Sequence, residues 1–489
     1  MFRFFVTIVI VALIGFSCRK ETLLEDNGAT LEFSTDTIVF DTVFSTVGSA
    51  TQLLTIYNPY NKTLRIKSIT LARGPSSQFS INVNGTAGVS FKDIDIAAKD
   101  SLFVFARVTI DPGNMNNPFV VTDSIIFETN GQLQDVDLVA WGQDAYYHTP
   151  DHFFPNFPPY SIIDCALPWT NDKPHVVYGW AVVDSGTVLT MNPGTRVYMH
   201  NESVLWVYSD GSLKINGTND DQVIIQGDRL EHYYDDVPGQ WGRIWLSAGS
   251  KDNVIDHAHI KNGTIGLLVD TLGASASPTL TIRNSIVENM SFAGLYAQGS
   301  VVLADNCVFA NCAQYCVALA LGGWYEFTHC TIANYWKYQN RTTPALILNN
   351  YYEDVNGAIQ VRTLEKAWFG NCIIFGSNET EIGFDQFPAG TFSYLFDNSL
   401  IQIDPEINTS DANFYNNIIK NPTAFIIEDV LHDPVFNDQS KYDFRLFADS
   451  KARNAGNMSI ATPLPDDLEG NSRLQDGQPD LGAYEFQPD

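Results

Sequence analysis

The sequence predicts an all-β protein, in which an antiparallel β-sandwich is followed by a parallel β-helix. Up to about residue 144, apolar residues alternate in short runs between turn signals. In the second half, a polar residue, a small Ser or Cys and two apolar or β-branched residues recur, first after 22 and then after 23 residues. Such a period, built on short strands, is typical of a solenoid whose coils stack on their neighbours. The recurring phrase reads Asn284-Ser285-Ile286-Val287, Asn306-Cys307-Val308-Phe309, His329-Cys330-Thr331-Ile332 and Asn371-Cys372-Ile373-Ile374.

Composition limits the classes of partner. The chain of 489 residues is long enough for two or three domains, and its 45% hydrophobic and 17% charged residues are typical of a folded protein. The formal net charge is −28, which repels phosphate backbones, so we expect no nucleic-acid partner. The same charge disfavours broad capture of acidic polysaccharides, although a local basic groove would still permit it. We expect a monomer.

The first 18 residues predict a lipoprotein signal peptide. Met1-Phe2-Arg3 gives a positive start, and the apolar run Phe4–Phe16 is too short for a comfortable membrane span. The run ends in Phe16-Ser17-Cys18, which resembles a bacterial lipobox, in which the Cys becomes the lipidated first residue. This resemblance implies attachment of Cys18 to the outer membrane, on its cell-surface or periplasmic face, through a polar tether over 19–30. The alternative is a plain signal peptide with an incidental Cys.

Residues 31–144 predict the sandwich. The strand-like runs are Asp36–Val43, Gln52–Tyr57, Thr63–Leu71, Phe79–Val83, Phe91–Ile96, Leu102–Ile110, Asp123–Glu128 and Val136–Ala140. Seven or eight short strands separated by turn signals indicate two packed antiparallel sheets. The pattern Thr55-Ile56-Tyr57-Asn58 followed by Leu64–Ile69 resembles bacterial immunoglobulin-like modules of the Hydin/ASPM type, which are spacers or adhesion units. A linker rich in Pro and aromatic residues follows over 145–160.

Residues 161–489 predict the β-helix with a C-terminal cap. Short strands of three to six residues alternate with Gly and Asn corners, as in Pro193-Gly194-Thr195, Gly239-Gln240-Trp241-Gly242 and Ile260-Lys261-Asn262-Gly263. This texture resembles right-handed parallel β-helix proteins of bacterial surfaces, which share the pectate-lyase-like superfold. The closing residues, Asp467–Arg473 and Pro479–Glu485, resemble the final segment of such proteins. We expect this segment to cap the open core of the last coil. The spacing stretches between 333 and 370, where the sequence leaves open a long loop or an extra coil.

The cysteines of the repeat predict buried thiols. Cys307, Cys330 and Cys372 share one slot of the phrase, and stacked strands lie about 4.8 Å apart, whereas disulfide Cβ atoms lie about 3.8 Å apart. We therefore expect an inward-facing stack of free thiols rather than disulfides. Cys312 and Cys316 could mimic half of a metal site, but no matching pair follows them, so we interpret them, like Cys165, as buried thiols.

Two stretches rich in aromatic and charged residues are candidate ligand-binding loops. The first gives Trp324, Tyr325, Tyr335, Trp336, Lys337, Tyr338 and Arg341, and the second, within 228–245, gives His232, Tyr233, Tyr234, Asp235 and Trp241. Aromatic rings can stack on sugar rings, and charged groups can bind hydroxyls. The alternative for the second stretch is a corner loop that shields a coil edge. By resemblance to β-helical polysaccharide lyases, Lys337 or Arg341 would act as a base or neutralise a uronate.

The remaining candidates point to the scaffold. Asp256, His257 and His259 share one predicted strand, but the resemblance to β-helix proteins implies that these positions belong to the scaffold. Asp466, Asp467 and Asp480 could bind Ca²⁺, although a hydrogen-bonded cap is the simpler interpretation, and we expect no other cofactor. We therefore expect a lipid-anchored envelope protein whose β-helix binds an extended ligand, in particular a glycan, without catalysis. A carbohydrate-active enzyme, lyase rather than hydrolase, is the first alternative, and an adhesin that binds proteins is the second.

Overall fold

The computed structural model describes residues 22–44, 48–49, 51–110, 119–271, 277–423, 425–427, 430–475 and 477–488. The chain divides into two compact units, one of residues 1–144 and 230–232 and the other of residues 145–229 and 233–489. The predicted signal peptide and Cys18 lie outside the described residues. Within the described residues, no helix is long and apolar enough to cross a membrane. Part of the tether predicted over 19–30 belongs to the first unit instead. The Leu24 amide donates to the Thr63 carbonyl (2.9 Å), and Ala29 is buried in the core of that unit.

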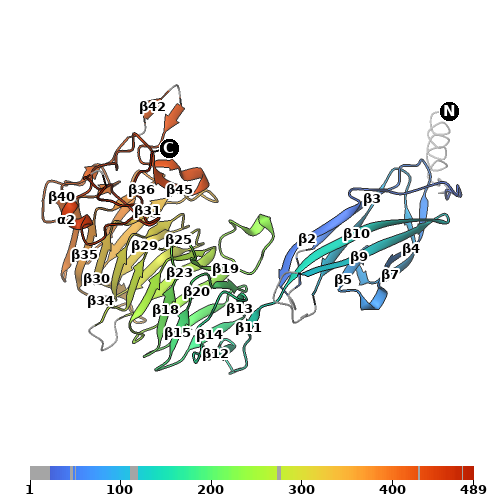
Figure 1. The fold of residues 1–489 in the computed structure, drawn as a ribbon, viewed down its shortest axis with the longest axis horizontal. Helices are drawn as coiled ribbons and strands as arrows, with labels where there is room; N and C mark the ends of the chain where they lie inside the picture. Colours follow the sequence, from blue (N-terminus) through green and yellow to red (C-terminus); the bar gives the residue numbers. More distant parts are fainter. Residues whose placement is uncertain are drawn as a thin grey trace, which may run out of the picture. The chain divides into compact units, whose positions relative to one another are not determined.

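The first unit is a β-sandwich, as predicted (Figure 1). One sheet has the order β1 (Glu32–Phe33), β3 (Gln52–Tyr57), β8 (Ser101–Val108), β5 (Phe79–Val83) and β6 (Thr86–Gly88). The other has the order β2 (Thr37–Phe44), β10 (Gln132–Gln143), β9 (Phe119–Thr129), β4 (Leu64–Leu71) and β7 (Ser90–Ile96). All strand pairs are antiparallel except β2 with β10, which is parallel. The short strands β1 and β6 were not predicted, and a 3₁₀ turn, η1, spans Gly74–Ser76.

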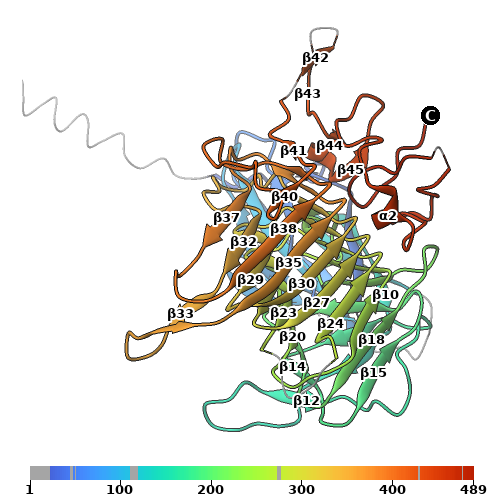
Figure 2. The same ribbon diagram turned by 90° about the vertical axis from the view of Figure 1, so that its left-hand side faces the viewer.

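The second unit is a parallel β-helix with three sheets, which confirms the predicted fold class (Figure 2). Sheet 1 has eleven strands: β11 (Tyr146–His148), β13 (His175–Val177), β16 (Arg196–Met199), β19 (Val223–Gly227), β22 (Ala258–Lys261), β25 (Ile286–Glu288), β28 (Val308–Ala310), β31 (Thr331–Asn334), β36 (Ile373–Gly376), β39 (Leu400–Ile401) and β41 (Ile419–Lys420). Sheet 2 has nine: β12 (Tyr160–Ile162), β14 (Trp180–Val183), β17 (Val204–Val207), β20 (Trp241–Leu246), β23 (Gly263–Val269), β26 (Ala293–Gln298), β29 (Tyr315–Ala320), β32 (Leu346–Asn349) and β37 (Ile382–Asp385). Sheet 3 has nine: β15 (Val188–Met191), β18 (Ser212–Asn216), β21 (Asn253–Asp256), β24 (Leu280–Arg283), β27 (Val301–Asp305), β30 (Gly323–Thr328), β35 (Leu364–Gly370), β38 (Phe392–Asp397) and β40 (Tyr415–Asn416).

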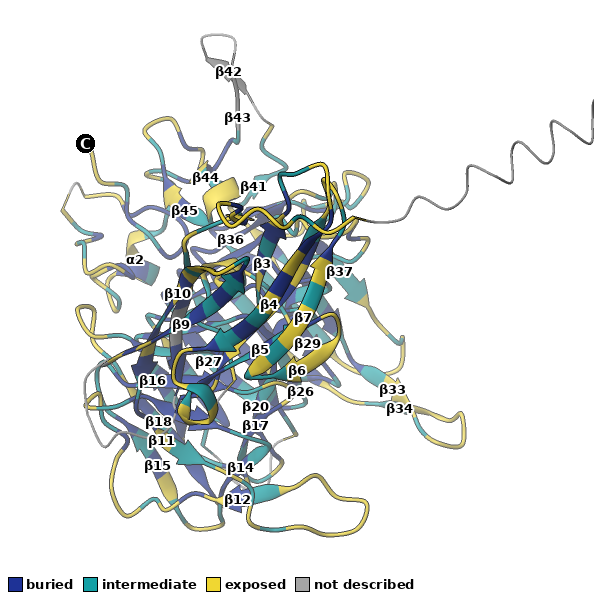
Figure 3. Cartoon of the chain, turned by 90° about the vertical axis from the view of Figure 1, so that its right-hand side faces the viewer, coloured by how far each residue is buried: buried dark blue, intermediate teal, exposed yellow. Residues whose placement is uncertain are grey.

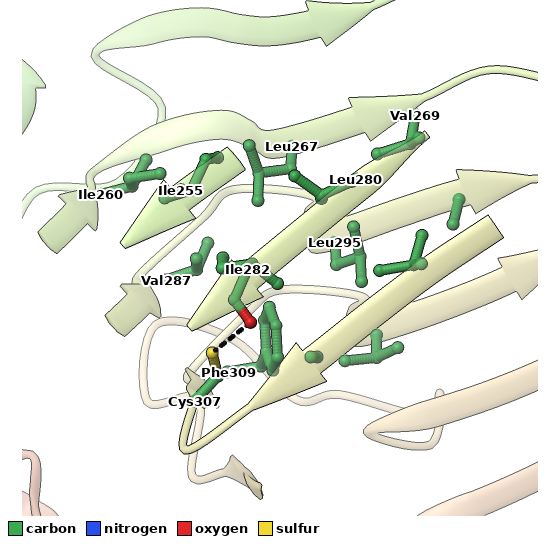
Figure 4. Packing of buried hydrophobic residues seen from close by; sticks show 14 of the residues in the cluster. Ile255, Ile260, Leu267, Val269, Leu280, Ile282, Val287, Leu295, Cys307 and Phe309 are labelled. Carbon is green, nitrogen blue, oxygen red and sulfur yellow. Dashed lines mark hydrogen bonds between the residues drawn. The ribbon is translucent and has the colours of Figure 1, made fainter. Parts of the chain in front are cut away.

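Alternation along each strand builds the core of the solenoid. In sheet 3, Ile255 pairs with Ile282, and in sheet 1, Ile260 pairs with Val287, so β-branched apolar side chains stack from coil to coil. These side chains are fully buried and face one another across the interior (Figure 4). Because successive strand residues point to opposite faces, the residues between them form the outer faces of the three sheets.

The recurring phrase forms the corner between sheets 3 and 1. The residue at its first position has a positive φ in six successive coils: Asn284 (46°), Asn306 (52°), His329 (50°), Asn371 (52°), Asn398 (49°) and Asn417 (48°). Asn tolerates this left-handed conformation better than most residues, which lets the chain turn within two residues. The second residue points inward, and Cys307, Cys330 and Cys372 are buried free thiols there, as predicted.

The stretch between 333 and 370 is one coil with two insertions, not an extra coil. A loop joins β31 to β32, and a hairpin of β33 (Tyr351–Glu353) and β34 (Ile359–Val361) precedes β35. The hairpin projects from the solenoid and is largely exposed at its tip (Figure 3). At the other end, β11 and β12 belong to the sheets, so the solenoid begins within the predicted linker, at Tyr146 rather than at Ser161.

The C-terminal segment differs from the expected cap, because it packs against the outer face of sheet 1. It contains β42 (Phe425–Ile427), β43 (Val430–His432), β44 (Phe436–Asp438), η3 (Gln439–Lys441), β45 (Asp443–Leu446) and the helix α2 (Met458–Ala461). Val308, Ala333 and Phe375 on sheet 1 share one buried cluster with Phe436 and Leu481 from this segment. The outward residues of sheet 1 are apolar in these coils, which explains why they need a cover.

Candidate functional site

The two predicted loops lie against each other in the structure. The Tyr338 hydroxyl donates to the backbone carbonyl of Asp236, which joins the loop between β31 and β32 to the loop before β20. The Lys337 ammonium lies 4.8 Å from the ring centroid of Tyr442 and 5.7 Å from that of Tyr338. Trp336 packs on Tyr338 with ring centroids 4.9 Å apart. Trp336, Lys337 and Tyr338, which the sequence predicts to bind a ligand, therefore contact other residues of the protein.

Three predicted ligand-binding residues are buried, and the prediction is wrong for them. Tyr325 and Trp241 have no exposed surface; the Tyr325 hydroxyl donates to the Gly322 carbonyl (2.7 Å), and Trp241 Nε1 donates to the Lys261 carbonyl (2.9 Å). Both rings fill the solenoid interior, so neither can contact a ligand on the surface.

Arg341 is the third buried residue. Its guanidinium contacts both carboxylate oxygens of Glu381, at 2.5 and 2.8 Å, and also donates to the Asn334 carbonyl at 3.0 Å. The two charged side chains are 1% and 0% exposed. A bidentate pair with this burial holds the base of the loop, and it is closed to a uronate.

The other predicted residues keep mainly structural contacts. The Tyr335 hydroxyl donates to Asp433 (2.6 Å), and its ring packs in the cluster beneath the C-terminal segment. Tyr233 is 80% exposed and packs on Tyr234 in the 3₁₀ turn η2 (His232–Tyr234). The carbonyl of Asp235 accepts a hydrogen bond from the side chain of Asn262 (2.8 Å).

Trp324, in contrast, belongs to a polar and aromatic cluster on the outer face of sheet 3. The cluster, called the sheet 3 site below, consists of Trp324 and Glu326 on β30, Lys366 and Trp368 on β35, Arg283 on β24, Asp305 on β27 and Thr328 on β30. Four residues of this site line a cleft of about 580 Å³ together with residues of the C-terminal segment: Arg283, Asp305, Thr328 and Trp368, with Ser459, Ile460, Pro463 and Leu464.

Lys366 is the centre of the sheet 3 site. Its ammonium lies 5.3 Å from the ring centroid of Trp324 and 5.7 Å from that of Trp368. Glu326 accepts hydrogen bonds from Lys366 (2.7 Å) and from Trp324 Nε1 (2.9 Å). The side chains of Lys366 and Glu326 are 37% and 32% exposed, so they hold this arrangement at the surface.

The two carboxylates of the site have opposite pKa shifts. Burial raises the pKa of Asp305, and hydrogen bonds from Thr328 and Arg283 offset only part of this effect. Burial acts in the same direction on Glu326, but the hydrogen bonds from Lys366 and Trp324 outweigh it and lower its pKa. The Arg283 guanidinium lies 3.3 Å from the Asp305 carboxylate. The site therefore combines flat aromatic rings with charged hydrogen-bonding groups.

The register of the coils is a sequence signal for this site that the prediction from single stretches missed. Arg283, Asp305, Thr328 and Gly370 each precede the corner residue of the phrase, so they stand in one register. Counting back two residues from Thr328 gives Glu326, and counting back two from Gly370 gives Trp368. Aligning the coils on the phrase would have placed these side chains together.

The candidate Ca²⁺ carboxylates serve the backbone of the C-terminal segment. Asp467 accepts hydrogen bonds from the amides of Glu469, Asn471 and Glu485. Asp480 accepts from the amides of Asn454 and Phe486. No group of three or more His, Cys, Asp or Glu that could hold a metal ion occurs within the described part of the chain.

Comparisons with known proteins identify no relative by sequence. No protein-family description matches the chain, and no curated protein matches it. Among solved structures, the catalytic unit of the GH87 α-1,3-glucanase from Streptomyces thermodiastaticus strain HF3-3 aligns over 76% of this chain and 89% of its own, with 12% identity and a TM-score of 0.19. A family 123 glycoside hydrolase from Clostridium perfringens aligns over 24% of this chain and 28% of its own, with 11% identity and a TM-score of 0.18. The PapD-like domain 7 of human CEP192 aligns over 26% of this chain and 94% of its own, with 10% identity and a TM-score of 0.17. These TM-scores carry no argument about function.

Proposed function

We propose that the solenoid binds an extended glycan along the outer face of sheet 3. The observation that carries this proposal is the pair Trp324 and Trp368 on neighbouring coils, with Lys366 and Glu326 beside their rings. The apolar face of a sugar ring can pack on an indole, while a carboxylate and an ammonium beside it bind the hydroxyls. Hydrogen bonds to charged groups are stronger than those between neutral groups, so few are needed for orientation.

The arrangement suits a long ligand because the same register returns in every coil. Arg283, Asp305, Glu326, Trp368 and Asp397 come from five successive strands of sheet 3. Arg283, Asp305 and Asp397 share one register, and Glu326 and Trp368 share the register two residues earlier. Because successive strands lie about 4.8 Å apart, these side chains form two neighbouring rows parallel to the solenoid axis.

The charges favour a neutral glycan over a polyuronate. Arg283 and Lys366 are both paired with carboxylates, at 3.3 and 2.7 Å. The formal net charge of −28 also repels an acidic polymer. A neutral glycan needs no free cation, because hydroxyls can accept from and donate to the existing pairs.

Binding to a panel of neutral and uronic-acid polysaccharides tests the proposal. The full chain should be retained by at least one neutral polymer, and Trp324→Ala and Trp368→Ala should each weaken retention at least about tenfold, as expected for loss of a stacking platform. Trp141→Ala is the matched control, since Trp141 is a 37% exposed indole of the sandwich. Equal retention of all variants, or retention by polyuronates alone, would overturn the proposal.

A polysaccharide-cleaving enzyme is the second candidate, favoured by the opposite pKa shifts of Asp305 and Glu326. Carboxyl groups whose environments separate their pKa values can act as an acid and a base. The two residues lie on adjacent strands, two positions apart in register, which places their Cα atoms about 8 Å apart. Shortened products in the same panel, detected by mass spectrometry and absent with Asp305→Asn, would support this candidate over binding alone.

We further propose that Cys18 carries a lipid that attaches the protein to the outer membrane. The support is the lipobox-like end of the apolar N-terminal run. In cells that make the protein, the mature form should fractionate with membranes and carry acyl chains by mass spectrometry. Cys18→Ser should lose both properties, and a membrane-bound Cys18→Ser variant would contradict the proposal.

A further inference from the structure

An aromatic pocket lies on sheet 2, a different face from the sheet 3 site. The residues that line it are Phe154, Phe157, Tyr160, Ile162, Val182, Asp184, Trp206 and Tyr208, and its volume is about 470 Å³. All of them lie in the first coils of the solenoid. This pocket plays no part in the proposed glycan site, and none of its residues was among the candidates from the sequence.

The register of sheet 2 builds the floor of the pocket. Three outward side chains pair from strand to strand: Ile162 on β12, Val182 on β14 and Trp206 on β17. The residues that flank Val182 and Trp206 along their own strands are buried in the core. Asp184 and Tyr208 follow β14 and β17 at equivalent positions, since the Tyr208 amide donates to the Val183 carbonyl at 3.0 Å. The carboxylate and the phenol therefore stand side by side at one edge.

The aromatic rings form walls that meet at steep angles. Phe157 stands at 84° to Tyr160, with centroids 5.7 Å apart, and Trp206 stands at 86° to Tyr208, with centroids 5.2 Å apart. Phe157 also packs on Trp206 at 6.1 Å. Tyr208 and Phe157 are 44% and 39% exposed, so the rings contact one another without being sealed from solvent.

The polarity of the lining selects the charge of the ligand. Asp184 is the one ionisable group of the lining other than the tyrosines, and no Lys, Arg or His is among these described residues. The faces of aromatic rings carry negative partial charge and attract cations. Next to the pocket, Trp245 stacks on Trp206 with ring centroids 5.1 Å apart. The Arg243 guanidinium lies 5.6 Å from the Trp245 ring centroid, so a cation of the protein already contacts an aromatic ring there.

We infer that the aromatic pocket binds a small organic cation with apolar substituents, such as a quaternary ammonium group. Rings supply cation–π attraction and apolar contact, and Asp184 supplies the opposite charge. The volume exceeds what a bare metal ion needs, and apolar walls offer such an ion no oxygen ligands. The formal net charge of −28 raises the local concentration of cations around the molecule.

Calorimetric titration of the full chain with choline tests the inference, with 3,3-dimethylbutan-1-ol as its neutral isostere. Choline should bind saturably, with a dissociation constant in the millimolar range or below, and the neutral isostere at least about tenfold more weakly. Asp184→Asn should weaken choline binding about threefold or more without changing the shape of the pocket. Tyr208→Ala should weaken it about tenfold, and Trp141→Ala, an exposed indole of the sandwich, should leave it unchanged.

Further titrations define the source of the cation and the opposing result. Binding to phosphatidylcholine vesicles but not to phosphatidylglycerol vesicles would assign the cation to a lipid headgroup, and binding of free choline alone would assign it to a soluble compound. Equal binding of choline and its neutral isostere would overturn the inference. So would tighter binding of a neutral methyl glycoside, or choline binding that survives both Asp184→Asn and Tyr208→Ala.

Discussion

The buried pair of Arg341 and Glu381 gives the sharpest test of the structure, because the sequence suggested a catalytic or ligand-binding role for Arg341. In the structure its guanidinium is closed off by Glu381 and two backbone carbonyls. Arg341→Met keeps much of the apolar stem but leaves the Glu381 carboxylate buried without its partner. The variant should therefore lose stability whatever ligand the protein binds.

The size of the loss follows from the burial of the pair. Removing one partner of a buried ion pair costs about 3–5 kcal/mol, and side chains that are 1% and 0% exposed belong in this range. Unfolding entropy is about 2.1 cal/mol/K per residue, so a solenoid unit of about 340 residues changes its Tm by about 1.4 °C for each kcal/mol. The expected fall in Tm is about 4–7 °C.

Thermal unfolding followed by Trp fluorescence measures this change, because eight of the nine tryptophans lie in the solenoid. Arg341→Met with Glu381→Leu should recover most of the loss, since replacing both charges by apolar groups removes the buried unpaired carboxylate. Arg362→Met is the matched control: its guanidinium stacks on Tyr352 at the surface (5.2 Å), and its effect should stay within about 0.5 kcal/mol. An unchanged Tm for Arg341→Met, or a double variant as unstable as the single one, would refute the structural role.

Three further predictions concern the corners, the first coils and the thiols. Asn371→Ala should cost about 2–4 kcal/mol in urea denaturation, because the side chain bonds His329 (2.9 Å) and the φ of 52° disfavours Ala; an effect below 1 kcal/mol would contradict this. Burial lowers the pKa of His148 to about 4, and burial together with His148 lowers that of His175 to about 3. These folded-state pKa values lie below the unfolded value of about 6.5, so both neutral imidazoles contribute fully to stability above pH 6.5. As the pH falls from 7 to 5, the free energy of unfolding should fall by about 2 kcal/mol per imidazole, and it should decline further toward pH 4 and 3. A urea midpoint that is the same at pH 7 and pH 5 would disprove it. In a Cys18→Ser protein, Ellman's reagent should label Cys165 rapidly and the other five thiols only after unfolding, since those five are buried; rapid labelling of two or more would show that the stack is open.

The sequence predicted the strands better than the site, and the residues show why. Strand positions depend on local alternation and turn signals, so the sandwich strands agree with the predicted runs within a few residues. The same alternation places Tyr325 and Phe327 in the core and Trp324 and Glu326 on the surface. The prediction of Tyr325 as a ligand-binding residue was wrong because it considered only nearness in the sequence and not this alternation. Trp368 was not predicted as a site residue. It lies beside Trp324 because β30 pairs with β35, and the inserted hairpin separates these two strands in the sequence.

Long-range partners explain the other errors. Arg341 meets Glu381 across 40 residues, and no local pattern indicates that a loop arginine turns inward. The closing segment was expected at the end of the last coil, because an open core needs a cover. Its actual position depends on the apolar outward residues of sheet 1, such as Val308 and Phe375. In the sequence, these residues and their inward neighbours form continuous apolar runs, which are also typical of a strand that is buried on both faces.

The position of the C-terminal segment has a consequence for how the chain matures. Its residues bond to coils made much earlier: Asn457 with Asn371, Asp466 with Asn306, and Glu469 with Asn219, at sequence separations of 86, 160 and 250 residues. During synthesis, the apolar side of sheet 1 therefore stays uncovered until the segment between Val435 and Phe486 has left the ribosome. A coil displaced by one strand would move these partners apart by about 4.8 Å, beyond hydrogen-bond reach. This segment can therefore make all three contacts only when the coils from Asn219 to Asn371 are stacked in the correct register.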